Sequence, residues 1–116
     1  MDSDLDPAEV FSRCQHHLLA AASAHAERIV FEAFLTNVQA MPEGPERDLM
    51  SQVASLHALA EIERDRAWWL EHGRLSTERA KAITRAVDAL CRELSKHALT
   101  LVDAFGVPDQ LLPQEI

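Results

Sequence analysis

The sequence predicts an all-α protein: an up-down-up bundle of three long helices with a short C-terminal turn or helix. Its 116 residues include only three glycines and no tyrosine, whereas the helix-favouring residues alanine, leucine, glutamate and arginine are abundant. Two Gly/Pro-containing breaks divide the chain into helical stretches with apolar residues at intervals of three and four. This length suits a single domain with one core.

The first helix is expected from about Pro7 to about Gln39. Asp6 supplies an N-cap, Pro7 fits the first helical position, and Glu9 favours the positive helix end. The apolar residues of this helix cover more than one stripe; they include Phe11, Cys14, Leu18, Ala21, Ala22, Ile29, Phe31, Phe34, Leu35 and Val38. A helix that is apolar around so much of its circumference is normally contacted on more than one side, so we expect a further partner surface.

The second helix is expected from about Pro45 to His72, after a connector at 41–45 that holds two prolines and a glycine. Its predicted inner face comprises Leu49, Val53, Leu56, Leu59 or Ala60, Ala67 and Leu70. On the surface, Glu61 and Arg64 are three residues apart and can pair. Gly73 is suited to the left-handed position that ends a helix. Because only residues 73–75 follow before the next helix, the second and third helices should be antiparallel neighbours.

The third helix is expected to begin after an N-cap at Ser76 and to run to Phe105, where Gly106 and Pro108 stop it. One face carries apolar residues at helical spacing: Ala80, Ile83, Val87, Leu90, Leu94, Ala98, Leu101 and Phe105. We expect Phe105 to be a core aromatic that closes the last turn. Of the adjacent Trp68 and Trp69, which point about 100° apart on a helix, one should be core and the other should lie on the loop or contact a partner.

The composition excludes several classes of function. A formal net charge of −8 argues against nucleic acid or an anionic membrane as a partner, because both need clustered lysine and arginine. Cys14 and Cys91 form no paired motif and are expected to be buried free thiols in a reducing compartment. The acidic N-terminus lacks the apolar segment of a signal peptide, and no apolar run reaches a membrane-spanning length.

No pattern of catalytic or metal-binding residues emerges. The six histidines include no Glu-x-x-His and no His-x-x-x-His spacing. His57 and Glu61 share a helix face, but a pair of this kind occurs by chance on many helices. No base lies in a motif that would activate a serine or a cysteine, and no glycine-rich phosphate loop is present. The prediction is that this chain holds no catalytic, cofactor-binding or metal-binding residue.

Two blocks of sequence nevertheless are distinctive. They are LHALAEIERDRAWWLEHGRLS (56–76) and LCRELSKHALTLVDAFGVPDQLL (90–112), and the most specific run within them is Val-Asp-Ala-Phe-Gly-Val-Pro-Asp (102–109). These blocks resemble the C-terminal helical domain of the acyl-CoA oxidase family. Matching segments in the first helix, such as Gln-His-His-Leu-Leu (15–19), extend the resemblance over about residues 10–112. We therefore expect a frayed segment at 1–6, this helical domain at 7–112 and a tail at 113–116.

The resemblance implies a flavoenzyme family that oxidises acyl-CoA to trans-2-enoyl-CoA with FAD and O₂, releasing H₂O₂. In that family the glutamate base and most flavin contacts lie upstream of this domain, and no residue of this chain matches the base. The expectation is that the chain alone is inactive and binds no FAD. Its expected roles are packing and dimerisation, with the flavin and substrate domains or a second copy of itself as partner.

Two alternatives remain open from sequence. The chain is either the terminal domain of a larger acyl-CoA oxidase-like protein or a free-standing, non-catalytic helical interaction protein; a carrier of acyl chains between its helices is a weaker third idea. The final residues Gln-Glu-Ile (114–116) are not a peroxisomal tripeptide, which favours a bacterial-like cytoplasmic protein.

Overall fold

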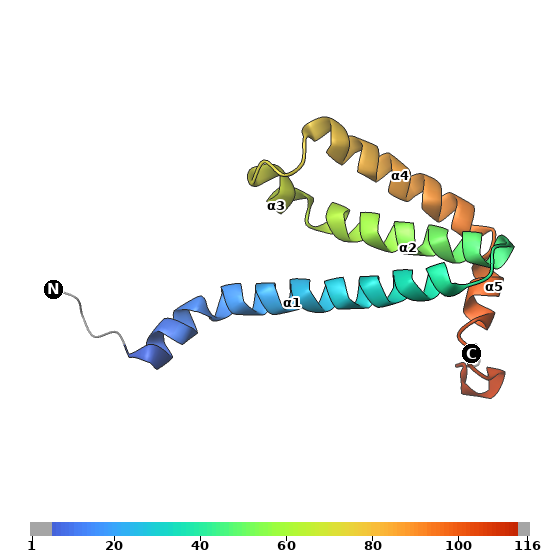
Figure 1. Cartoon of the computed structure of the whole chain (residues 1–116), viewed down its shortest axis with the longest axis horizontal. Helices are drawn as coiled ribbons and strands as arrows, with labels where there is room; N and C mark the ends of the chain where they lie inside the picture. The colour runs from blue at the N-terminus through green and yellow to red at the C-terminus, as the bar shows by residue number, and fades with distance from the viewer. Residues whose placement is uncertain (1–5, 114–116) are drawn as a thin grey trace. The chain divides into compact units, whose positions relative to one another are not determined.

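All regular structure in the described part of the chain, residues 6–113, is helical in a computed structural model of the protein (Figure 1). The elements are α1 (Pro7–Ala40), α2 (Pro45–Arg64), α3 (Arg66–Glu71), α4 (Thr77–Ser95), α5 (Ala98–Asp103) and the 3₁₀ helix η1 (Asp109–Leu111). The all-α prediction is confirmed, and α1, α2 and α4 are the three long helices. Residues 1–5 and 114–116 lie outside the described part of the chain. They make up most of the two predicted terminal segments, 1–6 and 113–116.

The chain divides into two compact units, Met1–Met41 and Pro42–Ile116. In the first unit, α1 is a single helix of 34 residues whose bounds agree with the prediction. Its N-cap is the predicted one, because Asp6 Oδ1 accepts a hydrogen bond from the backbone N–H of Ala8 at 3.2 Å. Two ion pairs along the exposed helix, Glu9–Arg13 and Glu32–Arg28, have the four-residue spacing that supports helices.

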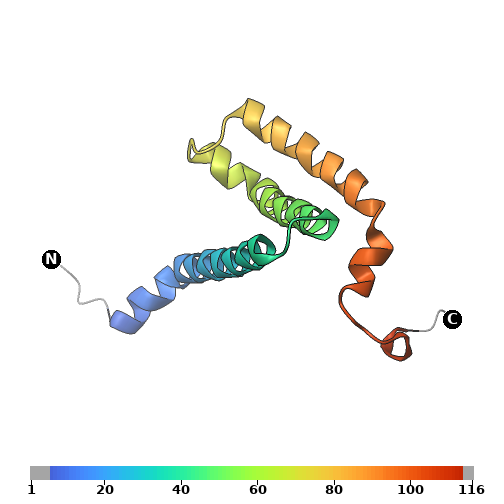
Figure 2. The same cartoon turned by 45° about the vertical axis from the view of Figure 1, so that its right-hand side comes forward.

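In the second unit, α2 and α4 pack against each other and run in opposite directions (Figures 1 and 2). The turn between α3 and α4 depends on Gly73, whose φ of 64° lies in the left-handed region that side chains with a Cβ rarely adopt. Ser76 then caps α4 by accepting a hydrogen bond from the N–H of Arg79 at 3.2 Å. The predicted helix stop at Gly73, the predicted N-cap at Ser76 and the antiparallel pairing of the second and third helices are confirmed. The predicted packing of α1 in the same bundle stays a prediction.

The second and third predicted helices are each interrupted, so the stretches expected to be continuous up to His72 and Phe105 are each divided into two helices. Asp65 separates α2 from α3 with φ −97° and ψ 21°, and His97 precedes α5 with φ −111° and ψ 15°. Both residues occupy the bridge region of the backbone map. Before His97, the N–H of Lys96 bonds the carbonyl of Glu93, three residues back, so the last turn of α4 is tightened to 3₁₀ geometry. Apolar periodicity continues through both interruptions and therefore could not reveal them.

The core of the described residues is small. The buried hydrophobic side chains are Val38, Ala54, Ala80 and Leu94, and two of these four are alanines. Of the predicted inner face of α4 and α5, Ala80 and Leu94 are buried and the positions Ile83, Val87, Leu90 and Leu101 are half-buried. Four predicted core positions are exposed: Ala67, Leu70, Ala98 and Phe105. They lie beyond the interruptions, where the helix axis no longer follows the packed pair.

Three expectations about burial are wrong. Phe105 is 81% exposed and closes no core, because the chain turns out of the helix at Gly106 before any element covers the ring. Cys14 and Cys91 are both exposed rather than buried. Trp68 is 51% exposed and Trp69 is half-buried, so neither tryptophan is fully enclosed. Within residues 6–113, no helix is both long and apolar enough to cross a membrane.

Candidate functional site

The turn between α3 and α4 gathers the aromatic residues of the second unit. Trp68 stacks on His72 with ring centroids 4.3 Å apart and an interplanar angle of 20°, and Trp69 meets Trp68 edge to face at 5.0 Å. His72 caps α3, and its Nδ1 lies 2.8 Å from the carbonyl oxygen of Trp68, to which it can donate. His72 therefore lies at the negative end of α3, at the residue where the second helix was expected to end.

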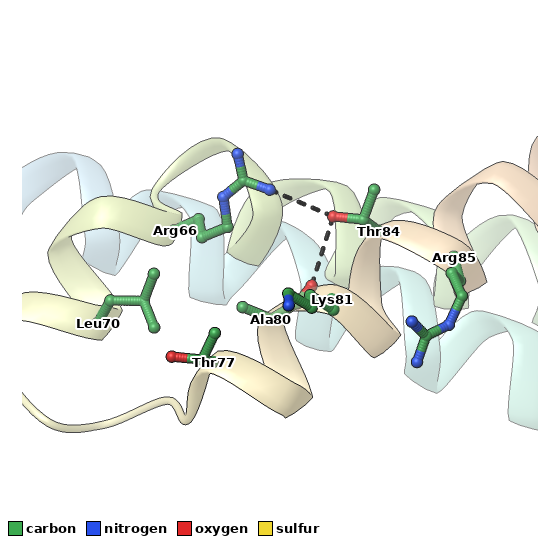
Figure 3. Close-up of a pocket in the computed structure, with 7 residues that line it drawn as sticks. All are labelled: Arg66, Leu70, Thr77, Ala80, Lys81, Thr84 and Arg85. Atoms are coloured by element: carbon green, nitrogen blue, oxygen red, sulfur yellow. Dashed lines mark hydrogen bonds between the residues drawn. The ribbon is translucent and has the colours of Figure 1, made fainter.

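Beside this turn, a cavity of about 420 Å³ lies between α3 and α4 (Figure 3). The lining is basic, with an apolar part and no acidic side chain; it consists of Arg66, Leu70, Thr77, Ala80, Lys81, Thr84 and Arg85. Arg66 Nη1 donates to Thr84 Oγ1 at 3.3 Å, and that hydroxyl donates to the carbonyl of Ala80 at 3.3 Å. We call this cavity the α3–α4 groove.

No pattern in the sequence predicted the α3–α4 groove. Arg66 ends the charged run Glu-Ile-Glu-Arg-Asp-Arg (61–66), which by itself indicates no site. Lys81 and Arg85 are four residues apart on one helix face, which was the available signal. Their proximity to Arg66 depends on the position of α3 beside α4, and the residue pattern of a single helix does not reveal that position.

Other charged residues form local pairs along their own helices. Glu61 pairs with Arg64, as expected from their spacing, and Lys96 Nζ lies 2.6 Å from Glu93 Oε2. The hydrogen bond and the positive charge of Lys96, with a smaller contribution from His97, lower the pKa of Glu93. Across the described residues, histidine, cysteine and carboxylate side chains form no group of three or more that could hold a metal ion.

Exposed large apolar side chains are the most extensive feature of the surface. On α1 they are Val10, Phe11, Leu18, Leu19, Ile29, Val30 and Leu35. In the second unit they are concentrated near the C-terminus and comprise Trp68, Leu70, Leu99, Val102, Phe105, Val107, Leu111 and Leu112. Extensive exposed apolar area on a protein marks contact surfaces more often than catalytic ones.

Comparison with known proteins gives one consistent result. The family model for acyl-CoA oxidase matches residues 1–113. The peroxisomal acyl-coenzyme A oxidase 3 of Arabidopsis thaliana is 36% identical over 104 residues, which cover 88% of this chain and 15% of that protein. An acyl-coenzyme A oxidase-like protein of Mus musculus is 28% identical over 98 residues, covering 84% of this chain and 16% of the relative.

The chain thus spans only a small part of these two relatives. A further Arabidopsis relative, 36% identical over 104 residues, is covered over 55% of its length. No solved structure matches the chain. The match of the family model to nearly every residue is decisive, and the protein belongs to the acyl-CoA oxidase family.

Proposed function

We propose that this chain is a helical packing domain of an acyl-CoA oxidase-like protein and contributes contacts rather than catalytic groups. The observation that carries the proposal is the imbalance between core and surface. Fifteen large apolar side chains are exposed in the described residues, whereas the buried hydrophobic residues number four. A helical unit with so little core of its own gains stability by covering apolar surface with other protein.

The difference in length supports this role. The relatives extend far beyond the matched region, since the chain covers 15% of the Arabidopsis oxidase and 16% of the mouse protein. In the proposed assembly, the flavin and substrate domains of such a protein would contact the apolar positions of α1 and the segment 99–112. Binding of FAD and the oxidation of acyl-CoA by O₂ would belong to those domains. The chain would help to hold them and to form a dimer.

The test is a search for chemistry in the isolated 116-residue chain. After incubation with excess FAD and removal of free flavin, we expect no flavin absorbance in the protein fraction. We also expect no H₂O₂ when acyl-CoA and O₂ are added, because the proposed packing domain would supply neither a catalytic base nor a flavin site. A complete acyl-CoA oxidase serves as the positive control. Bound FAD accompanied by peroxide formation would overturn the proposal.

A second candidate is a free-standing interaction protein that pairs with itself. The exposed apolar residues favour this candidate equally, because a second copy could cover them. Extending the gene's reading frame upstream separates the two cases: a continuous frame into a flavin domain supports the packing domain, and a stop codon supports the free-standing protein.

A further inference from the structure

One side of α1 is apolar and exposed over most of the length of the helix. Residues three, four, seven or eight positions apart lie on the same side of a helix. Five large exposed side chains follow this spacing: Phe11, Leu18, Leu19, Ile29 and Val30. Between them, the same side holds three smaller or polar residues that are also exposed: Gln15, Ala22 and Ala26. We call these eight residues the α1 face.

The α1 face has no cover within its own unit. Among the described residues of the unit Met1–Met41, α1 is the one element, and the five large side chains of the face are 47–62% exposed. A single helix has little stability in water, and most helical stability in proteins comes from packing of an apolar side. The α1 face is therefore suited to a partner that covers it.

The α1 face carries no formal charge, which suits a second copy of this acidic chain. None of its eight residues is Asp, Glu, Lys or Arg, and residues 14–26 contain none of these four types. Two copies with a net charge of −8 repel each other. That repulsion is weakest where both contact surfaces are uncharged. A basic partner would instead be recognised through acidic side chains, and the α1 face offers none.

The order of large and small residues along the α1 face is self-complementary in an antiparallel pair. If the two-fold axis passes between residues 20 and 21, Phe11 faces Val30 of the second copy. Leu19 then faces Ala22, and Gln15 faces Ala26. Each pairing joins a larger side chain to a smaller one, which fills the space between two helices. A parallel pair would instead set Phe11 against Phe11 and Ala22 against Ala22, leaving a gap at the alanines.

We propose that α1 pairs with α1 of a second copy, antiparallel and through the α1 face. The inference rests on the proposed contact role and names the partner of one side of the helix. Val10 and Leu35 lie on the other side and stay available to the flavin and substrate domains. The contact from Phe11 to Val30 is about 28 Å long at 1.5 Å per residue. Such an interface is small, so the pairing should depend on concentration.

The test is disulfide cross-linking of single-cysteine variants in a background in which Cys14→Ser and Cys91→Ser remove the native thiols. Gln15→Cys and Ala26→Cys are oxidised separately and as an equal mixture. We expect cross-linked dimer in the mixture, because the two positions face each other and a disulfide needs Cα atoms within about 7 Å. Either variant alone should form little dimer, because its two thiols would be about 16 Å apart along the helix axis.

The matched control is the pair His17→Cys and Ala24→Cys, which lies level about the same axis but on the opposite side of α1. This mixture should stay monomeric under the same oxidation, and circular dichroism should show that all variants stay helical. Equal cross-linking of the control mixture shows random collision and overturns the pairing. Equal cross-linking of Gln15→Cys or Ala26→Cys alone overturns the antiparallel orientation.

Absence of cross-linked dimer in the mixture of Gln15→Cys and Ala26→Cys also overturns the pairing. Sedimentation of the same samples separates this result from a failure of the proposed function. If the chain still self-associates without this cross-link, another surface makes the contact and the contact role stands.

Discussion

The ring of His72 stacks on the indole of Trp68 at the end of α3, with centroids 4.3 Å apart and planes inclined by 20°. The same histidine lies with Nδ1 2.8 Å from the carbonyl oxygen of Trp68. One residue therefore holds the last turn of α3 through both its ring face and its ring edge. The contact precedes Gly73, so it fixes the point from which the chain turns into α4.

Replacing His72 with alanine should loosen this turn. We expect the free energy of unfolding to fall by about 0.5–1.5 kcal/mol, the value of an aromatic contact, and the near-ultraviolet circular dichroism of the tryptophans to decrease. His25→Ala is the matched control, because His25 is an exposed histidine of α1 and lies in the other unit. The assignment of the stacking contact fails if the two variants have the same near-ultraviolet spectrum.

Leu94 is the largest side chain of the small core and is 6% exposed. Leu94→Ala should lower the free energy of unfolding by about 2–4 kcal/mol, because truncation removes buried apolar area and leaves a cavity. Leu99→Ala makes the same chemical change at a position that is 82% exposed and should alter stability very little. Denaturant unfolding of both variants measures the difference. Equal losses would contradict the burial of Leu94.

The start of α4 depends on the side chain of Ser76. Its hydroxyl accepts from the N–H of Arg79, so Ser76→Ala should cost about 1 kcal/mol in thermal or denaturant unfolding. Ser76→Asp retains a capping oxygen and should restore most of that stability. A capping role is ruled out if the aspartate variant is as unstable as the alanine variant.

The ion pair between Glu93 and Lys96 predicts a pH effect. The hydrogen bond from Lys96 and its charge lower the pKa of Glu93 in the folded chain. Because the pKa of Glu93 is lowered in the folded chain, the ion pair stabilises the fold at pH values above the ordinary glutamate pKa of 4.5. This stabilisation is lost as the pH falls through the lower pKa of the folded state. Carbon NMR of the carboxyl group should show that Lys96→Met raises the pKa of Glu93 towards its ordinary value.

The control for this titration is Lys81→Met, since Lys81 has no ion-pair partner within the described residues. That variant should leave the titration of Glu93 unchanged. An unaltered pKa of Glu93 in Lys96→Met would show that the ion pair does not persist in solution. Added salt should act in the same direction as Lys96→Met, because both groups are exposed and are screened by ions.

Local signals in the sequence predicted the helix ends well. Asp6 and Ser76 are N-caps, and Gly73 and Gly106 have φ of 64° and 62° as expected of left-handed stops. These features depend on short-range chemistry, namely a side-chain oxygen near a free N–H and a residue without a Cβ. The family resemblance, which rested on the segment 102–109, is likewise confirmed by the match over residues 1–113.

Burial and interruptions were predicted less well, for a physical reason. Periodicity shows which residues share a face but not whether another element covers that face, so Phe105 was expected in a core and is 81% exposed. Ala54, which is buried, was absent from the predicted inner face of the second helix. The α3–α4 groove likewise required the bend at Asp65, which sets Arg66 beside α4.

The central claim is that the exposed apolar surface is a contact surface, and sedimentation velocity over a wide concentration range tests it most directly. We expect the mass of the isolated chain to rise above the 13.0 kDa of a monomer as concentration increases, since a second copy can cover this surface. Leu19→Glu, at a site 61% exposed on α1, should shift the equilibrium towards monomer. Ala20→Glu adds the same charge at an exposed position about 100° further round α1 and should have a much smaller effect. A mass of 13.0 kDa at every concentration would contradict the claim.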